Sequence, residues 1–442
     1  MINIFQKLDI ETYDLLNSLN TAGYKNPTVL LEYDGTTRDD IESPFSYYLG
    51  KDKGRKRGRY FNEIVVPHYS EIKGNNRSAE IYDEDRKTAD VEYFAPKHRR
   101  IVKNVKWLDL KGRIRSIDHY NDYGRKFAET IVNADGKSVI KTYFDIEGKE
   151  KIIENFVTGD ITLYEGTKIK NFSNLQDFTI NYIYERGYNL DRIFYNSLST
   201  PFFITLKLNQ KEKNGNVLFW QEPINGNIPG NMNIILNENR SNTGKIVMQS
   251  KVAYANAKVL WPKDKLNMLE YLGNIYIHPR MNNMRKEALI LTNSDQIVHL
   301  KEIVEALPEV QFNIGAITEM SDKLMNFGRY KNVSLYPNIE TKDTRRLVEN
   351  SDIYLDINRA NEILDAIRGA FENNMLILGF DTMQHDKKFI APENTYAEDQ
   401  VDMMIGKIKE ALDDVDKMEE YIGYQRVFAG DETSERYQKI VG

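Results

Sequence analysis

Hydrophobic and polar positions repeat with two different periods along this chain. Near its beginning, residues 9–22 place Leu15, Leu16 and Leu19 on one side of an expected helix. Residues 27–33 follow as a short, mostly apolar run that is typical of a buried strand. A helix followed closely by such a strand predicts a layered α/β region at the start of the chain.

The middle of the chain carries a regular series of turns. Gly112, Gly124, Gly136 and Gly148 are twelve residues apart, and each closes a cluster that contains Asp or Asn. Glycine adopts a positive φ without steric cost, and strands of about eight residues joined by tight turns give this spacing. The pattern predicts an antiparallel β-meander over residues 60–160, with strands at Ile114–Tyr120, Lys126–Val132, Ser138–Phe144 and Lys151–Val157.

After the meander, helical and strand-like segments alternate again. Alternation of this kind implies parallel sheets with right-handed crossovers. The predicted helices are Leu175–Tyr184, Leu190–Leu198, Asp295–Leu307, Thr341–Asn350, Glu362–Glu372 and Asp399–Tyr424. The predicted strands are Pro201–Leu208, Val217–Glu222, Glu287–Leu291, Phe312–Ile317, Val333–Tyr336, Ile353–Ile357 and Met375–Phe380.

Composition narrows the functional classes. The 442 residues carry 60 Lys and Arg against 66 Asp and Glu, a formal net charge of −6, which argues against a nucleic-acid-binding protein. The absence of cysteine excludes disulfides, thiolate zinc sites and a cysteine nucleophile. The first residues do not have the pattern of a signal peptide, and no run is long and apolar enough to span a membrane, so we expect a cytoplasmic protein.

These patterns predict four parts. Residues 1–59 and 160–269 form an N-terminal Rossmann-like domain, residues 60–159 form the inserted β-meander, residues 270–424 form a second Rossmann-like domain, and residues 425–442 form a C-terminal tail. Two such domains facing across a cleft make up the GT-B arrangement of glycosyltransferases. The predicted fold class is therefore α/β and GT-B-like, with two Rossmann-like domains and an inserted antiparallel β-meander.

The candidate site residues follow from this fold. Ligands of open α/β sheets bind beyond the carboxyl ends of the strands. Trp220, Gln221 and Glu222 end a predicted strand, and we expect them, together with Arg280, to bind substrate in the cleft between the domains. A role in the core and as a strand cap is the alternative interpretation of the first three. The six histidines are scattered, so no metal site is expected.

A basic segment precedes the meander. Residues 51–59 contain six Lys or Arg, and Lys97, His98, Arg99 and Arg100 follow within the meander. One interpretation is a solvated loop. The alternative is a contact with acidic lipids, because each cationic residue near such a surface contributes roughly 1 kcal/mol of attraction.

Several stretches in order carry a family resemblance. They are Ser43-Pro-Phe-Ser-Tyr-Tyr-Leu-Gly50, Asp118-His-Tyr-Asn-Asp-Tyr-Gly124, Leu218-Phe-Trp-Gln-Glu222 and Ile228-Pro-Gly-Asn-Met232, with Asn26-Pro-Thr-Val and Asn155-Phe-Val-Thr-Gly-Asp-Ile161. In these stretches, spread over nearly the whole length, the chain resembles the GtfB family, the glycosyltransferase-stabilising subunits of the accessory Sec system in Gram-positive bacteria.

The resemblance implies a function. Members bind a homologous catalytic subunit, GtfA, in a heterotetramer with two copies of each, and the β-meander contributes to their contact. The complex transfers N-acetylglucosamine from UDP-N-acetylglucosamine to Ser and Thr of serine-rich repeat adhesins before their export. The GtfB-like subunit is not the catalyst; it stabilises GtfA and helps to bind the unfolded acceptor. The resemblance also implies a cytoplasmic complex held peripherally at the membrane, with no cofactor in this subunit.

The residues of this chain agree with a non-catalytic role. Retaining GT-B enzymes place two glutamates eight positions apart in the second domain; if Asp365 stands for the second, the first position holds Ile357. A shift of one residue brings Asp356 or Glu362 into consideration. The segment Leu291–Gln296 lacks the Arg and Lys that an active member offers to a diphosphate. An active retaining glycosyltransferase that uses a UDP-sugar remains the alternative, and a scaffold without acceptor affinity is a third possibility.

Overall fold

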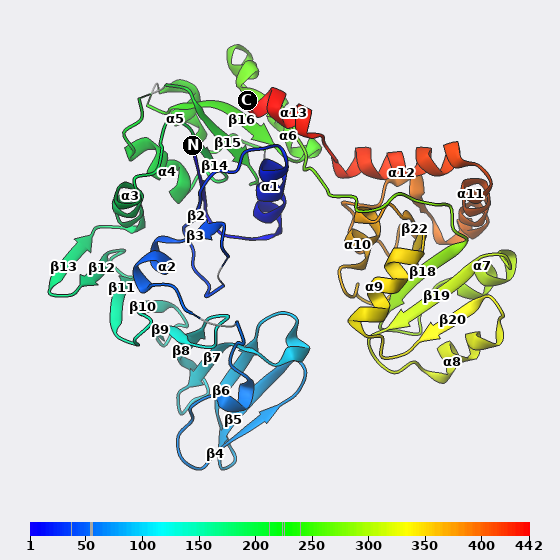
Figure 1. Cartoon of the computed structure of the whole chain (residues 1–442), viewed down its shortest axis with the longest axis horizontal. Coiled ribbons are helices and arrows are strands. Elements are labelled where there is room, and N and C mark those ends of the chain that lie inside the picture. Colours follow the sequence, from blue (N-terminus) through cyan, green and yellow to red (C-terminus); the bar gives the residue numbers. More distant parts are fainter. Residues whose placement is uncertain (37, 54–55, 212, 223, 225, 239) are drawn as a thin grey trace. The chain divides into compact units, whose positions relative to one another are not determined.

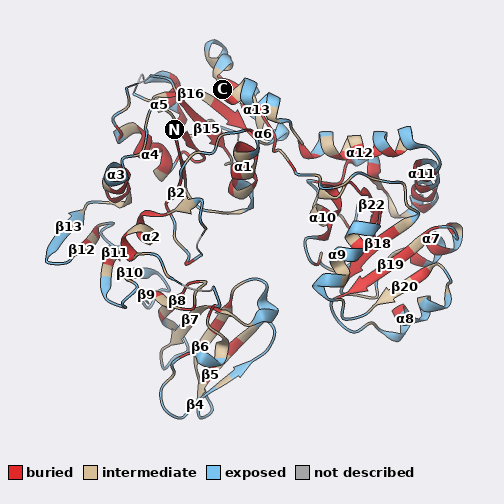
Figure 2. Cartoon of the chain, in the orientation of Figure 1, coloured by how far each residue is buried: buried red, intermediate tan, exposed pale blue. Residues whose placement is uncertain are grey.

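The computed structural model describes residues 1–442 except 37, 54–55, 212, 223, 225 and 239 (Figure 1). It separates into two compact units. Unit 1 comprises Met1–Tyr271 with Val441, and unit 2 comprises Leu272–Ile440 with Gly442. Each unit contains a parallel sheet whose strands are largely buried (Figure 2). The α/β class and the inserted antiparallel meander that the sequence predicted are therefore confirmed.

The parallel sheet of unit 1 has the order β17-β16-β15-β14-β1-β2-β3. When these seven strands are counted in the order of the sequence, the first lies beside the fourth, as in doubly wound sheets. The helices are α1 Ile10–Thr21, α2 Pro44–Leu49, α3 Leu175–Arg186, α4 Thr200–Lys207, α5 Met232–Asn237 and α6 Lys251–Leu260. The strands are β1 Ile2–Phe5, β2 Thr28–Leu30, β3 Ile41–Glu42, β14 Ile193–Tyr195, β15 Asn216–Trp220, β16 Thr243–Met248 and β17 Leu269–Tyr271.

The meander is a ten-stranded antiparallel sheet with its strands in sequence order, inserted in unit 1 between α2 and α3 (blue to teal in Figure 1). The predicted strands within it are confirmed. Because β12 pairs with β11 and β13 pairs with β12, the sheet continues beyond the boundary predicted at residue 159. Its strands are β4 Ser70–Gly74, β5 Ser78–Asp83, β6 Arg86–Tyr93, β7 Val102–Leu108, β8 Ile114–Tyr120, β9 Lys126–Val132, β10 Ser138–Phe144, β11 Glu150–Asn155, β12 Ile161–Glu165 and β13 Lys168–Phe172.

One core joins the meander to the parallel sheet of unit 1. Tyr143, Ile152 and Leu163 of the meander are buried in the same cluster as Phe45 of α2 and Phe178 of α3. The Phe45 and Tyr143 rings stack with their centroids 4.6 Å apart. Large aromatic side chains dominate such a core because each one removes much apolar surface from water. The inserted sheet is thus fastened to unit 1 through the two helices that flank it in the sequence.

The four periodic glycines all have a positive φ, between 76° and 87°. A Cβ added at Gly112, Gly136 or Gly148 would meet no atom within 4 Å, because these turns face open space. A Cβ at Gly124 would lie 2.7 Å from backbone atoms of both Gly58 and Arg59. Gly124 therefore serves two purposes: it forms the turn, and it allows the segment before the meander to pack closely against that turn.

The sheet of unit 2 has the order β20-β19-β18-β21-β22-β23, which again places the first strand beside the fourth. Its strands are β18 Glu287–Thr292, β19 Gln311–Ala316, β20 Val333–Tyr336, β21 Ile353–Asp356, β22 Leu376–Phe380 and β23 Thr395–Tyr396. Its helices are α7 Leu300–Ala306, α8 Asp322–Met325, α9 Thr341–Asn350, α10 Ala366–Glu372, α11 Val401–Asp413, α12 Val415–Ala429 and α13 Ser434–Val441.

Two of the predicted elements have the wrong type. Residues 190–198 were expected to be helical but contain the central strand β14, whose three residues are fully buried. Residues 201–208 were expected to form a strand but form α4, with Pro201 in the first helical turn, where a missing N–H costs nothing. The apolar run in each segment is short, Ile193–Tyr195 in the first and Pro201–Leu206 in the second, and a helix and a strand cannot be distinguished by periodicity in such runs.

Other helices differ in their limits. The expected helix 399–424 is two helices, α11 and α12, because Asp414 ends the first and caps the second by accepting a hydrogen bond from Asp416 N. The expected helix 295–307 begins only at Leu300, since His299 has a positive φ of 52°. The helix expected over 362–372 likewise begins at Ala366.

Candidate functional site

The strand order of each parallel sheet indicates where a ligand would bind. In doubly wound sheets the crevice opens at the carboxyl ends of the two strands at which the order reverses. These are β18 and β21 in unit 2, and β1 and β14 in unit 1. In GT-B enzymes the donor sugar binds at the second Rossmann-like domain along the chain, which is unit 2 here. A donor site is therefore expected at the carboxyl ends of β18 and β21.

In unit 2 the loops that follow these two strands are linked directly to each other. The backbone of Val298, in the loop after β18, donates to Ile357 O at 2.9 Å, and Arg359 N donates to Gln296 O at 3.0 Å. Below them the Thr292 hydroxyl donates to Asn358 Oδ1 at 3.0 Å, with both side chains buried. The two loops that would have to separate around a nucleotide are therefore hydrogen-bonded to each other.

The carboxylates at this edge also have partners within the chain. Asp356 Oδ1 is 2.6 Å from His385 Nδ1, and the His385 backbone N–H donates to Asp356 Oδ2 at 3.2 Å. Burial raises the pKa of Asp356 against the opposing effect of His385. Glu362 accepts a hydrogen bond from Ile367 N at 2.8 Å, and burial raises its pKa.

The register that the sequence suggested places no carboxylate in the crevice. Ile357 is fully buried in the core of unit 2, and Asp365 has a positive φ of 49° at the start of α10. Arg359, a cation beside β21, is engaged with Glu398 at 2.7 Å. A diphosphate requires charge-assisted donors, and this edge instead joins its charges to one another.

Trp220, Gln221 and Glu222 lie together at the carboxyl end of β15 in unit 1. Trp220 is only 1% exposed, and its indole N–H donates to Glu222 Oε2 at 3.3 Å. Gln221 Nε2 donates to Gln249 Oε1 at 2.7 Å, and Glu222 accepts from the Ser197 hydroxyl at 2.6 Å. The three residues thus have contacts within the fold, and their contact with an acceptor stays a prediction.

The other members of this polar cluster were not predicted from the sequence. Asn196 Nδ2 donates to Gln221 Oε1 at 3.0 Å and also to the Thr12 hydroxyl at 2.9 Å. Asn196, Ser197 and Gln249 follow directly after the strands β14 and β16. A polar residue directly after a buried strand was the available signal, and the wrong type assigned to residues 190–198 concealed it.

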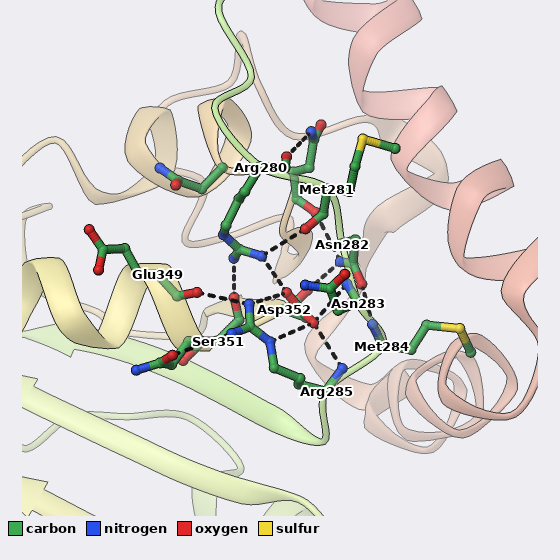
Figure 3. A network of polar contacts seen from close by, with 12 residues as sticks. Arg280, Met281, Asn282, Asn283, Met284, Arg285, Glu349, Ser351 and Asp352 are labelled. Atoms are coloured by element: carbon green, nitrogen blue, oxygen red, sulfur yellow. Dashed lines mark hydrogen bonds and ion pairs between the residues drawn. The ribbon is translucent and has the colours of Figure 1, made fainter.

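Arg280 lies in unit 2, apart from the other candidates, which belong to unit 1. Its guanidinium pairs with Asp352, which has a fully buried side chain, and donates to Val348 O at 3.0 Å (Figure 3). Arg285 approaches the same carboxylate with Nε at 3.1 Å from Oδ2 and Nη2 at 3.0 Å from Oδ1. The network fastens residues 280–285 to the start of β21. Whether Arg280 also contacts an acceptor stays a prediction.

Unit 1 contains a cavity of about 560 Å³ at the carboxyl ends of β1, β2 and β3, beside its own crevice. None of the residues expected to bind substrate lines it. Its walls include the apolar side chains Leu8, Leu30 and Ile41 and the ring of Tyr33. Its charged lining residues are Asp9, Glu32, Asp34, Asp39, Glu42 and Asp52, with Lys7, Arg38 and Lys51. The acidic cluster after the strand predicted at residues 27–33 was the signal in the sequence.

The basic segment before the meander is largely engaged within the chain. Lys56 pairs with Asp122 at 3.2 Å, Arg57 pairs with Glu63, and Arg59 Nε donates to Gly124 O at 2.8 Å. Gly54 and Arg55 of this segment lie outside the described residues. Lys97, His98 and Arg99 are exposed. A contact of these residues with lipid stays a prediction.

The described residues contain no candidate metal site and no candidate membrane-spanning helix. Residues 1–442, apart from the seven positions left out, contain no group of three or more His, Asp or Glu side chains placed to hold a metal ion. In the same part of the chain, no helix has the length and apolar character needed to cross a membrane.

Comparison with known proteins identifies the family. Models of the GtfB N-terminal, middle and third domains match residues 2–48, 70–173 and 175–260, and a GftB/GlyA-F C-terminal domain model matches residues 288–425. The UDP-N-acetylglucosamine–peptide N-acetylglucosaminyltransferase stabilizing protein GtfB of Streptococcus pneumoniae serotype 4 is 40% identical over 443 residues, which cover 100% of this chain and 99% of that protein. The chain belongs to the GtfB family. The GtfB protein of Streptococcus gordonii is 38% identical over 442 residues, covering 100% and 98% of the two chains.

A solved structure agrees over the same length. A chain in the crystal structure of a GtfA/B complex bound to UDP and GlcNAc matches with a TM-score of 0.92 and 38% identity, covering 99% of this chain and 98% of that one. A chain of the structure of accessory secretory proteins 1, 2 and 3 of Streptococcus pneumoniae matches with a TM-score of 0.62 at 13% identity and shares the fold. The GT-B-like fold of this GtfB family member is thereby confirmed.

Proposed function

We propose that this GtfB family member is the non-catalytic, stabilising and acceptor-binding subunit of a protein O-glycosyltransferase. Its partner is a catalytic GtfA-like subunit, two copies of each forming a heterotetramer, and its acceptor is a serine-rich repeat polypeptide that is glycosylated on Ser and Thr before export. Family membership over the whole chain supports this proposal, because the relatives are named as stabilising proteins of a peptide N-acetylglucosaminyltransferase.

One structural observation carries the non-catalytic part of the proposal. The crevice of unit 2 is crossed by the backbone hydrogen bonds of Val298 and Arg359, at 2.9 Å and 3.0 Å, where a nucleotide-sugar would have to lie. Asp356 is bonded to His385, and Arg359 to Glu398, so neither charge is presented to a ligand. Binding of UDP-N-acetylglucosamine at this edge would break these contacts. Because Arg359 is already paired with Glu398, it offers no free cation to the diphosphate that would offset the loss.

The meander offers a surface for the catalytic partner. Paired residues of antiparallel strands share a face, so the pairing places Ile131, Ile140, Ile153, Tyr164 and Ile169 together on one side of β9–β13. Ile131 and Ile169 are 43% and 61% exposed, and the others are partly exposed. The pairing also places Glu129, Thr142 and Thr162 on this side, so the apolar side chains lie among polar ones. Exposed apolar side chains grouped in this way are where we expect a partner to pack.

The other side of the same strands is already occupied. Tyr143, Ile152 and Leu163 alternate with the exposed residues and are buried against α2 and α3. The exposed face is therefore the side of the sheet on which a partner can pack without unfolding unit 1. We place the principal contact with the GtfA-like subunit there, and we place the complex in the cytoplasm, held peripherally at the membrane by the basic residues of the meander.

The first test of the proposal is a calorimetric titration of the purified chain with UDP-N-acetylglucosamine. Because backbone hydrogen bonds cross the crevice, we expect no heat of binding at nucleotide-sugar concentrations up to about 1 mM. This result would mean a Kd above about 1 mM, which is a binding free energy weaker than about −4 kcal/mol. The GtfA-like partner, titrated in the same buffer, is the control that must bind. Saturable binding to the isolated chain would favour an active glycosyltransferase instead.

A second test addresses the partner contact. Replacing Ile153 with Asp places a charge in the centre of the exposed face, and we expect the affinity for the GtfA-like subunit to fall at least about tenfold, since desolvating that charge costs more than 1.4 kcal/mol. Thr88→Asp is the control, because Thr88 is partly exposed and lies on β6, outside this face. Equal affinities of the two variants, measured by biolayer interferometry, would move the contact elsewhere.

A further inference from the structure

The cavity of unit 1 has the position of a ligand site but not the chemistry of a nucleotide site. It lies at the carboxyl ends of β1, β2 and β3, beside the point at which the strand order of the sheet reverses. Its volume of about 560 Å³ falls within the range of ordinary ligand pockets. A doubly wound sheet usually uses this position, at the start of the first helix, to hold phosphate.

The start of that first helix is closed to anions. The Asp9 carboxylate caps α1 by accepting a hydrogen bond from Thr12 N at 3.0 Å. Partial burial opposes ionisation of Asp9, but the bonds from Thr12 and the ammonium of Lys7 outweigh it and lower its pKa. The positive end of the helix is thus met by a negative charge of the protein, where a phosphate would otherwise bind.

The remaining charges extend this exclusion around the cavity. Six lining residues are carboxylates and three are cationic among the described residues. Asp34, Glu42 and Asp52 are paired within the chain, with Lys103 at 3.5 Å, Arg186 at 2.9 Å and Arg125 at 2.8 Å. Glu32 and Asp39 are exposed, and Glu32 accepts a hydrogen bond from Gln6 Nε2 at 3.1 Å. A ligand entering past them crosses a negative potential.

We propose that this cavity is a subsite for an extended segment of the acceptor polypeptide and that it selects the segment by charge, taking uncharged or basic stretches and rejecting acidic or phosphorylated ones. The inference rests on the proposed acceptor-binding function. The floor of Leu8, Leu30 and Ile41 packs against the apolar parts of the segment. The carboxylates at the opening accept hydrogen bonds from Ser and Thr hydroxyls and pair with Lys or Arg.

The selection has a simple physical origin. A serine hydroxyl donates to a carboxylate, whereas a glutamate or phosphoserine can only present like charge to it. All the residues that line the cavity belong to unit 1. The site therefore discriminates among acceptor segments before any chemistry takes place on the partner.

The experiment compares two labelled peptides of equal length with the complex of this chain and its GtfA-like partner. One peptide is serine-rich and uncharged, and in the other every third residue is Glu. Fluorescence anisotropy at low salt is expected to show binding of the first peptide at least tenfold tighter than binding of the second. In the double variant Glu32→Gln, Asp39→Asn the gap should narrow to threefold or less, because the acidic peptide is no longer repelled.

A matched variant controls for net charge. Glu84→Gln with Asp85→Asn removes the same two charges from the exposed hairpin between β5 and β6, and it should leave the tenfold gap unchanged. If the uncharged peptide binds but the gap is the same in both double variants, the charge-selecting subsite is refuted and the acceptor-binding function stands. If neither peptide binds to the complex, the proposed acceptor-binding function itself fails, and the subsite fails with it.

Discussion

Replacing Asp352 with Asn is expected to lower the free energy of unfolding of unit 2 by about 3 to 5 kcal/mol, the range for breaking a buried ion pair. The Asp352 side chain is fully buried and accepts from the backbone N–H groups of Asn283 and Arg285 at 3.0 Å and 2.8 Å. It also pairs with the guanidinium groups of Arg280 and Arg285 (Figure 3). The amide of the variant carries an NH2 group, which would face at least one of these N–H donors. It also leaves the two arginines beside an uncharged group.

The measurement is urea denaturation followed by the far-ultraviolet circular dichroism of the purified chain. Asp343→Asn on α9 provides the control, because Asp343 only approaches Arg346 at 3.4 Å and both side chains are exposed to solvent. Surface pairs of this kind contribute little, so we expect a change within about 0.5 kcal/mol. Equal midpoints for the two variants would show that the network around Asp352 adds nothing to stability.

Acidification from pH 7 to pH 5 is expected to destabilise unit 1 by about 2 kcal/mol through His119 alone. Burial, and then the nearby Lys141, Lys103 and Lys126, lower the pKa of His119 to about 3. The geometry fits a neutral ring, with Nδ1–H donating to Asn104 Oδ1 and Nε2 accepting from the Thr130 hydroxyl, both at 2.8 Å.

The sign follows from the protons bound in each state. Between about pH 6.5 and pH 3 the unfolded chain protonates this histidine and the folded chain does not, so stability falls as the pH falls through that window. His119→Gln keeps a donor and an acceptor but does not titrate. Its stability, measured by denaturant titration at pH 7 and pH 5, should change about 2 kcal/mol less than that of the parent chain; identical pH dependence would contradict the prediction.

Much of the fold could be predicted from periodicity because long segments carry a clear signal. The meander strands 114–120, 126–132 and 138–144 are confirmed to the residue, since apolar and polar positions alternate and glycine turns bound each strand. β1 was not recognised as a strand, because its four residues, three apolar and the buried Asn3, are too few to establish a period. The same lack of period explains the wrong types of β14 and α4.

The site was harder to predict because it depends on contacts distant in sequence. The sequence showed that position 357 holds isoleucine. It did not show that Val298 bonds to Ile357 and Arg359 to Gln296 across the crevice, because these partners are about sixty positions apart. Gln221 and Glu222 were recognised as neighbours, whereas their partners Asn196 and Ser197 follow a strand that was misassigned. The sequence indicated the cavity of unit 1 only through the acidic cluster after residues 27–33, because its other lining residues, such as Lys7, Ser46 and Tyr123, are brought together only by the fold.

The four glycine turns are equal in sequence and unequal in what they allow. At three of them an added Cβ would meet no atom within 4 Å, although the positive φ of each turn still favours glycine. Gly124 alone is pressed against the backbone of Gly58 and Arg59. This close approach supports the inserted sheet together with the core that Tyr143, Ile152 and Leu163 share with α2 and α3. Any side chain at position 124 would therefore push these segments apart, on the sheet that carries the surface proposed to meet the partner.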